Sequence, residues 1–509
     1  MPRALPLYAA ALSTCSALVF LTGCSPSKAN TDTASASSNA PDSSATAKPA
    51  ARIVSLTTSS AEARDLYLKG RTLAEQLRFQ DGRKLFEQAA AADPAFAMAH
   101  YQLAVTSATA KDFFAHLKEA VALSDKASEG ERLTIRILEA NGNAKPKEAL
   151  DLTEQLVAKY PDDVRAHFLL GTADFGRQDW DRAIGELQKC TTLDPTFSGA
   201  YNLLGYSYRA VEKYDDAEQA FRKYIDLIPN DPNPYDSYAE LLMKTGRFNE
   251  SIAQYGKALS IDPHFGNSHI GIATNLMLQS KHDAGAAEAQ KLYDAARDDG
   301  DRRFALFART VIYVDGGRTK AALGEAQKEY DLDAARGDSA NMAGDAVLIG
   351  NILLNAGNTS AAAERFRHSI EIVRKSGLST DVKEDAELGV HYNDGRVALA
   401  RGDLATAKKE SAAYSSGAEE RHNTFRIKQA HQLAGSIALV EKQFDSAIAE
   451  LDQGNRQDPQ VLYLMALAYR GKGDMPKARD LAQRAAKANI LPLVTYAFVR
   501  TKAAKLAGA

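Results

Sequence analysis

The sequence has few of the features on which enzymes and disulfide-stabilised domains depend. It contains three cysteines in 509 residues, Cys15, Cys24 and Cys190, and no two of them have CxxC spacing. A disulfide framework is therefore not expected, and Cys190 should be a small buried side chain on a helix. The HExxH, GxSxG, GxxxxGK[ST], EF-hand and zinc-site patterns are missing too. These absences argue against an enzyme, and we expect neither a cofactor nor a small-molecule substrate.

The sequence also has little net charge and few prolines. The formal net charge is −3, so no overall field would attract nucleic acid, and no nucleic-acid partner is expected. Proline is sparse after residue 50 while alanine is frequent, and both favour helix over sheet. A chain of 509 residues is too long for one compact core. We therefore expect an all-α protein built as several domains or as one repeat array.

The N-terminus has the pattern of a secretory signal. Arg3 is followed by a mostly apolar run over residues 4–23. A single-pass anchor is the alternative, because roughly 20 apolar residues can span a bilayer. The run ends in Leu21-Thr22-Gly23-Cys24, which resembles the lipobox of bacterial lipoproteins. This resemblance implies that residues 1–23 are a cleaved signal peptide and that Cys24 is lipidated, which gives the protein a lipid anchor to the membrane.

The residue after the cysteine bears on the membrane. In lipoproteins of Gram-negative bacteria an Asp at this position retains the protein at the inner membrane, whereas here it is Ser25. The resemblance thus implies an outer-membrane anchor with the folded part in the periplasm, if the organism is Gram-negative. Between Ser25 and Ala51 almost no large apolar residue occurs, so this stretch cannot offset its ordering entropy. We predict a lipidated cysteine and disordered linker over residues 24–59.

A repeat of 34 residues runs through the middle of the chain. Pro161, Pro195, Pro229 and Pro263 follow one another at that interval. The sequences between them align, as AHFLLGTADFGRQDWDRAIGELQKCTTLDP and AYNLLGYSYRAVEKYDDAEQAFRKYIDLIP show. This period, with Gly, Ala, an aromatic residue and Pro at fixed offsets, resembles the tetratricopeptide repeat. Each unit should be a pair of helices in which small residues such as Gly205 and Ala217 allow close approach, and neighbouring pairs must stack.

The pattern continues beyond Pro263 in longer units. In these units a Gly or Thr again stands 12 residues before an Ala. The pairs are Thr310 and Ala322, Gly350 and Ala362, Gly395 and Ala407, and Gly435 and Ala447. We therefore predict regular repeats over residues 60–297 and longer repeats with a C-terminal cap over residues 298–509. The expected fold is a superhelical solenoid of about twelve helical hairpins, closed by a helix from Pro492 to about Lys505.

One stripe on the first helix of the strongest repeats is the candidate binding surface. Its positions share one helix face, and in the resembled family this face lines a groove that binds peptides. The stripe mixes aromatic residues, Arg, Met and amides, whereas a merely solvated face would be rich in Lys and Glu. Packing between neighbouring repeats is the alternative role. The predicted groove residues are Arg165, Phe168, Phe175, Asn202, Tyr206, Arg209, Asp236, Glu240 and Met243.

Two further features remain open. His264 and His269 could form a two-histidine metal site, but packing and surface roles are favoured because no further ligand has suitable spacing. The basic stretch between Arg470 and Lys505 fits either a solvated cap or a surface for an acidic partner. The family's clamp for acidic chaperone tails is not expected, since Phe168 and other unsuitable residues occupy its positions.

The sequence as a whole predicts a membrane-tethered scaffold or adaptor that binds a protein or peptide partner in the bacterial envelope. The alternative is a subunit or regulator of an envelope assembly or secretion machine, of the kind that serves outer-membrane protein or pilus biogenesis.

Overall fold

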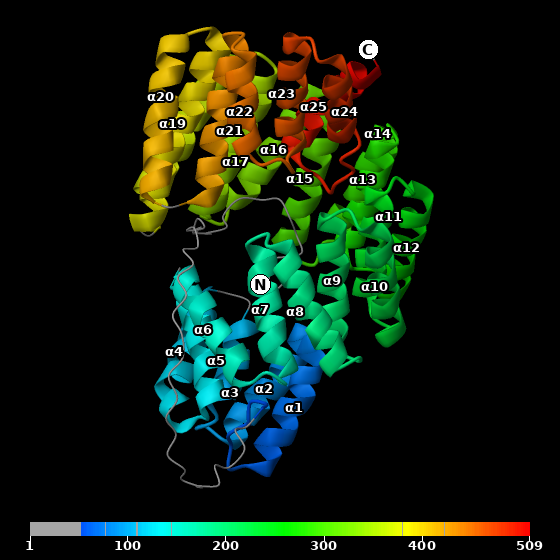
Figure 1. The fold of residues 1–509 in the computed structure, drawn as a ribbon, viewed down its shortest axis with the longest axis vertical. Helices are drawn as coiled ribbons and strands as arrows, with labels where there is room; N and C mark the ends of the chain where they lie inside the picture. The colour runs from blue at the N-terminus through cyan, green and yellow to red at the C-terminus, as the bar shows by residue number, and fades with distance from the viewer. Residues whose placement is uncertain are drawn as a thin grey trace, which may run out of the picture. The chain divides into compact units, whose positions relative to one another are not determined.

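The computed structural model describes residues 52–508 except residues 77, 108, 109, 144, 379 and 422. The predicted signal peptide, Cys24 and most of the predicted linker lie outside the described residues. The described chain forms twenty-five α-helices and contains no β-strand, so the predicted all-α class is confirmed (Figure 1). It divides into two compact units, an N-terminal unit up to Ser207 and a C-terminal unit from Tyr208.

The N-terminal unit contains the first eight helices and most of the ninth, together with a short 3-10 turn at Ser124–Lys126. Its helices are α1 (Ala61–Glu75), α2 (Phe79–Ala92), α3 (Ala97–Val105), α4 (Ala110–Leu123), α5 (Glu129–Gly142), α6 (Pro146–Lys159), α7 (Val164–Gly176), α8 (Trp180–Leu193) and α9 (Ser198–Ala210).

The C-terminal unit contains the remaining sixteen helices. They are α10 (Tyr214–Leu227), α11 (Pro232–Lys244), α12 (Phe248–Ile261), α13 (Gly266–Leu278), α14 (His282–Asp294), α15 (Asp299–Asp315), α16 (Thr319–Ala334), α17 (Ser339–Asn355), α18 (Thr359–Lys375), α19 (Thr380–Arg401), α20 (Leu404–Glu420), α21 (Thr424–Val440), α22 (Phe444–Gln453), α23 (Pro459–Lys472), α24 (Met475–Ala486) and α25 (Val494–Gly508).

In chain order these helices make twelve successive pairs and one terminal helix, as the repeat pattern predicts. The repeating prolines act as predicted at the ends of the second helices. Helices α6, α8, α10 and α12 each end two residues before one of them. Proline lacks an N–H donor, and it also disfavours helical backbone in the residue before it.

The 12-residue offset of small residues places the two helices of a pair in close contact. Alanines at the second position of this offset are fully buried, for example Ala183, Ala322 and Ala407. On the facing helix of one pair, a Cβ atom added at Gly350 would lie 2.5 Å from Cε1 of Phe366. Only a residue without a side chain fits such a contact, so this part of the register is confirmed.

The longer repeats predicted from residue 298 onward arise mainly from longer helices. Helices α15 to α21 contain 16 to 22 residues, whereas most helices before them contain 13 to 15. The division between the compact units does not fall at this change, but at Ser207 within α9.

The described chain begins with an ordered segment, Arg52–Ser60, where we expected the linker to continue to residue 59. The guanidinium of Arg52 donates to the Asp162 carboxylate at 2.9 Å. The backbone N–H of Val54 donates to Asp163 at 2.9 Å, and that of Thr57 donates to Glu131 at 2.8 Å. Polar side chains on the loop before α7 and on α5 thus satisfy this segment's backbone, which its own composition did not predict.

Candidate partner-binding surface

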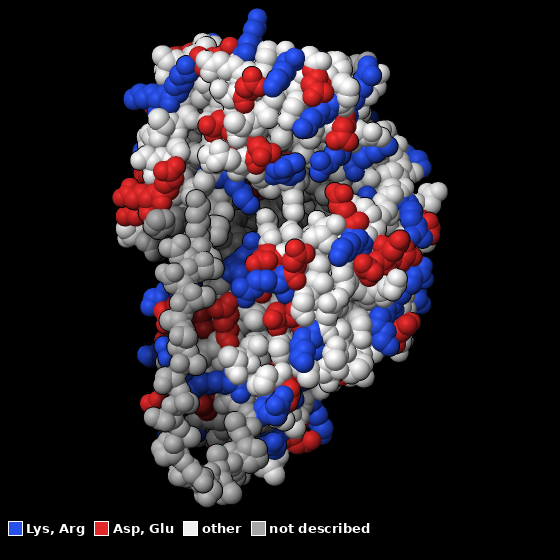
Figure 2. All heavy atoms as spheres, in the orientation of Figure 1, with Lys and Arg blue, Asp and Glu red and all other residues white. Residues whose placement is uncertain are grey.

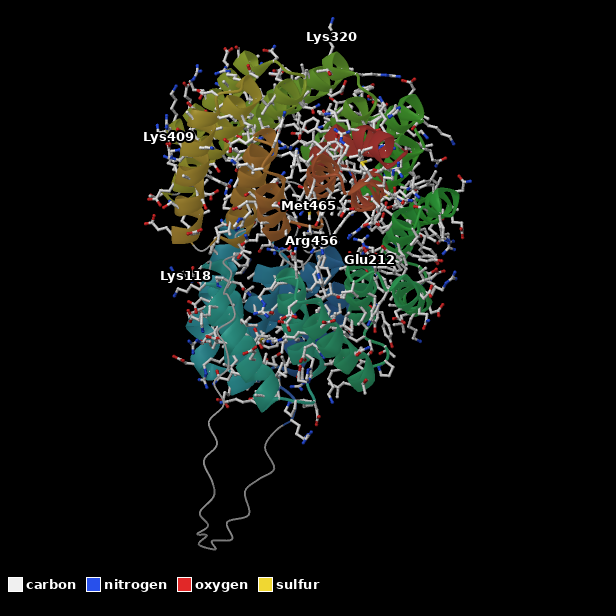
Figure 3. The ribbon with its side chains drawn as sticks, turned by 45° about the horizontal axis from the view of Figure 1, so that its top comes forward. Lys118, Glu212, Lys320, Lys409, Arg456 and Met465 are labelled. Atoms are coloured by element: carbon white, nitrogen blue, oxygen red, sulfur yellow. The ribbon has the colours of Figure 1, made fainter. Side chains whose placement is uncertain are left out.

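The first helices of neighbouring pairs form one layer in the C-terminal unit. Helices α11, α13 and α15 contact each other in succession, and so do α19, α21 and α23. The second helices instead pack between their own partner and the next first helix, as α14 and α16 do. Lys320 on α16 and Lys409 on α20 project from this second layer into solvent (Figure 3). We call the layer of first helices the inner layer.

The predicted stripe on α7 belongs to the N-terminal unit and makes contacts within that unit. The guanidinium of Arg165 donates to both carboxylate oxygens of Glu75 on α1, at 2.7 and 3.0 Å. The ring of Phe168 packs edge-on against Phe197 with centroids 5.1 Å apart. Phe175 packs in the same manner against Trp180, at 5.2 Å. These stripe residues are partly exposed, so their binding role stays a prediction.

Five predicted groove residues are buried and cannot face an open groove. They are Asn202, Tyr206, Asp236, Glu240 and Met243. The prediction of an open groove at these positions is wrong. The stripe has a mixed composition because it packs against neighbouring helices, which was the alternative that the sequence left open.

The contacts of α11 show how its polar stripe residues are satisfied. The Ser268 hydroxyl on α13 donates to the Asp236 carboxylate at 2.7 Å. Burial, and next the charge of Glu240, raise the pKa of Asp236 to about 8. Glu240 accepts from the partly exposed guanidinium of Arg209 at 3.0 Å. Asp236 and Glu240 thus join neighbouring repeats and present little surface to a partner.

The inner layer of α17 to α23 has a different character, because polar residues there remain partly exposed. Arg396 on α19 donates to the Asn351 amide oxygen on α17 at 2.8 Å, and its guanidinium lies 5.2 Å from the centre of the Tyr392 ring. Gln432 on α21 donates to Gln460 on α23 at 3.2 Å. These four residues make two hydrogen-bonded pairs of polar side chains on successive first helices, α17 with α19 and α21 with α23. We call them the amide row.

The C-terminal segment of the chain covers the inner layer of α11, α13 and α15. Met243, Ile270 and Met277 share one apolar cluster with Tyr496 and Phe498 of α25. Figure 1 shows α25 beside α15, although 185 residues separate Arg500 from Asp315, with which it pairs. Sequence reasoning missed this covering. Its signal was the nearly continuous apolar run from Ala488 to Val499, because so many apolar side chains in succession are normally buried.

A histidine–glutamate pair joins the two helices of several repeats at a constant separation. His167 contacts Glu186, His269 contacts Glu288, His391 contacts Glu410 and His431 contacts Glu450, each across 19 residues and at 2.6 to 2.8 Å. The other ring nitrogen of His269 lies 3.3 Å from the Pro263 carbonyl oxygen. His269 therefore has a packing role, which the sequence favoured over a metal site. The repeated spacing was readable in the sequence and links the later repeats to the earlier ones.

Two open hollows and the absence of a metal-binding cluster characterise the described residues. Among them, no group of three or more His, Cys, Asp or Glu side chains could hold a metal ion. Open hollows of about 630 and 650 Å³ lie beside Lys145–Gln155 and Gly317–Ala321. The helices of this part of the chain also include none that is long and apolar enough to cross a membrane.

Acidic and basic side chains are intermixed on the visible surface (Figure 2).

The basic C-terminal stretch is not wholly available to a partner. Arg500 is in a buried ion pair with Asp315, Lys472 pairs with Asp445, and the ammonium of Lys477 lies 4.8 Å from the centre of the Tyr469 ring. An acidic ligand for this stretch stays a prediction.

Comparison with known families agrees with this geometry. One tetratricopeptide repeat profile matches residues 67–123, 136–196 and 170–232, and a second matches residues 233–265. These segments are tetratricopeptide repeats. The solenoid of helical pairs continues to α24, beyond the matched residues, with the same offsets of small residues.

Individual relatives are distant. Anaphase-promoting complex subunit 3 of Schizosaccharomyces pombe is 24% identical over 241 residues, which are 43% of this chain and 35% of that protein. The chain thus spans about a third of the length of this curated relative. A chain in the crystal structure of the APC/C hetero-tetramer Cut9–Hcn1 has 15% sequence identity to this chain and a TM-score of 0.40. The match covers 83% of this chain and 76% of that one. MamA from Desulfovibrio magneticus RS-1 is 17% identical with a TM-score of 0.31, over 34% and 99% of the two chains.

Proposed function

We propose that this tetratricopeptide repeat protein is a scaffold or adaptor that binds a protein partner through its inner layer while a lipid holds it to a bacterial membrane. The repeat family and the partly exposed amide row support the binding role. The tether rests on the sequence Leu21-Thr22-Gly23-Cys24, which is typical of lipoproteins. Two or more acyl chains on Cys24 would anchor the protein stably, whereas one chain binds only marginally.

The amide row is the part of the inner layer best suited to a partner. Amide side chains of Asn351, Gln432 and Gln460 can donate to and accept from a peptide backbone. Arg396 is held by Asn351 and by the Tyr392 ring, so its guanidinium is already ordered before a partner arrives. A preordered Arg loses less side-chain freedom on binding a carboxylate, which favours affinity.

Capture of partners from membranes, with the lipid anchor intact, tests this proposal. The Arg396→Ala, Gln432→Ala double variant should retain at most a tenth of the bound partner, which corresponds to about 1.4 kcal/mol. Lys320→Ala, on the exposed surface of α16, is the matched control and should bind as the parent does.

Circular dichroism and thermal unfolding must show that the double variant folds normally. Equal recovery of the same proteins by the folded double variant and by Lys320→Ala would rule out the amide row as the binding surface. In a parallel experiment, Cys24→Ala should lose fatty-acid labelling, keep its signal segment uncleaved and fractionate apart from the normal lipoprotein pool. Labelling at the parent level would contradict the tether.

A further inference from the structure

The segment before α25 is fixed to the end of α11 by reciprocal hydrogen bonds. The Lys244 ammonium donates to the Ala488 carbonyl oxygen at 2.9 Å. The Asn489 side-chain amide donates in return to the Lys244 carbonyl oxygen at 3.4 Å. This carbonyl lies at the last residue of α11, where backbone acceptors lack a partner within the helix. The C-terminal segment therefore satisfies an acceptor that the inner layer leaves open.

A second fixed point lies at Arg500. Its Nε donates to Asp315 at 2.6 Å, and its terminal nitrogens lie 3.3 and 3.4 Å from the carbonyl oxygens of Leu278 and Met277. These acceptors stand at the C-terminal ends of α13 and α15, where the helix dipole favours a cation. The Asp315 side chain is fully buried and also contacts His282 at 2.8 Å. The arrangement is a pocket for one guanidinium.

Between these fixed points the contact is apolar and includes two methionines. Met243 and Met277, two of the seven methionines of the chain, pack in one cluster with Tyr496 and Phe498. Methionine is unbranched and polarizable, and it is common on surfaces that accept different apolar partners. Residues Lys487–Leu493, which connect α24 to α25, are not helical, so this part of the segment is not fixed by a helical hydrogen-bond ladder.

We propose that residues Ala488–Arg500 are an intramolecular ligand, and that they occupy a binding site for a partner segment of the same chemistry. Such a partner carries aromatic and aliphatic side chains followed by an arginine, which enters the pocket at Asp315. The C-terminal segment then regulates access, because a partner must displace it. This inference rests on the proposed scaffold function and adds a second site, on α11, α13 and α15, with its own specificity.

The regulation has a quantitative basis. A segment tethered to its own site competes at an effective concentration that reaches the millimolar range for short flexible linkers. A free peptide of equal intrinsic affinity would therefore bind poorly to the closed chain. Loss of the Arg500 guanidinium would weaken the internal ligand and leave the site itself unchanged, so the site should become available.

A labelled peptide with the sequence of residues 487–509 tests this proposal on the full chain in detergent. Arg500→Gln should bind the peptide at least tenfold more tightly than the parent does. Asp315→Asn should show no such gain, because it weakens the internal ligand and also removes the negative charge that would pair with the peptide's arginine. Lys505→Gln, a change at an exposed position of α25, is the control and should behave as the parent.

Failure of a folded Arg500→Gln variant to bind the peptide better than the parent would overturn the proposal. If that variant does not fold, hydrogen exchange of the parent protein tests whether the segment opens by itself. Amides of α25 should exchange at least tenfold faster than those of α15, and equal rates would show that the segment opens only with the whole unit. Failure of the scaffold function would instead appear as a chain that captures no partner in any form, whatever the peptide does.

Discussion

Two stretches of the same inner layer, both in the C-terminal unit, have opposite characters. On α11, α13 and α15 the layer carries Met243, Ile270 and Met277, and the end of the chain covers it. On α17 to α23 the equivalent layer carries the partly exposed amide row. The helical pairs are built alike in both stretches. The position of a residue within its repeat therefore determines which helix face it occupies. Whether that face is buried depends on the side chain itself and on residues distant in the sequence.

The largest expected effect is a loss of stability when the close contact between the two helices of a pair is disrupted, a contact on which both stretches depend. Gly350→Leu should lower the free energy of unfolding by about 3 kcal/mol, because even a Cβ there would lie 2.5 Å from Phe366. Gly344→Ala on the same helix is the control. Its Cβ would meet nothing within 4 Å, so it should stabilise by about 0.5–1 kcal/mol. Thermal or denaturant unfolding measures both, and equal stability of the two variants would contradict the assigned register.

A smaller effect is expected in the pH dependence of stability at the junction between the two stretches, where one guanidinium faces three carboxylates. Arg303 on α15 contacts Glu329 at 2.8 Å, Asp345 at 3.2 Å and Asp333. Burial raises the pKa of Glu329 to about 7, and burial together with the charge of Glu329 raises that of Asp345 to about 7. Asp338 also raises the pKa of Asp345. The folded state therefore binds protons that the unfolded state releases at lower pH.

The sign of the pH dependence follows from these raised pKa values. Stability from Glu329 and Asp345 is complete at acidic pH and is lost as the pH rises through about 7. We expect the unfolding free energy to fall by at least about 1 kcal/mol per group, mainly between about pH 4, where the unfolded carboxyls titrate, and about pH 7. Glu329→Gln with Asp345→Asn should flatten this dependence. An unchanged slope in denaturant unfolding of the double variant would show that these carboxylates do not titrate there.

The smallest effect concerns the histidine–glutamate pairs, which occur in both stretches. The His431–Glu450 contact at 2.8 Å is partly exposed, so His431→Gln should cost about 0.2–1 kcal/mol. His269 and Glu288 are more buried, with side chains 13% and 10% exposed, so His269→Gln should cost more. A cost for His431→Gln above that for His269→Gln would mean that burial does not set the strength of these pairs.

Much of the fold could be predicted from local sequence. The number of helical pairs, the terminal helix after Pro492 and the contact at Gly350 all follow from spacings within one or two repeats. The candidate site could be predicted only in part. The stripe on α7 and α11 was found, but Asp236 and Met243 are buried, and the amide row around Arg396 was not identified.

The sequence by itself determined the helical pairs, because the period of apolar and small residues directly sets which faces of adjacent helices meet. Only the tertiary structure decided which parts of the inner layer are covered. Lys244 meets Ala488 across 244 residues, and Met277 lies beside Arg500 across 223. No local periodicity encodes such a contact, since it depends on the accumulated rotation of every repeat between the two ends.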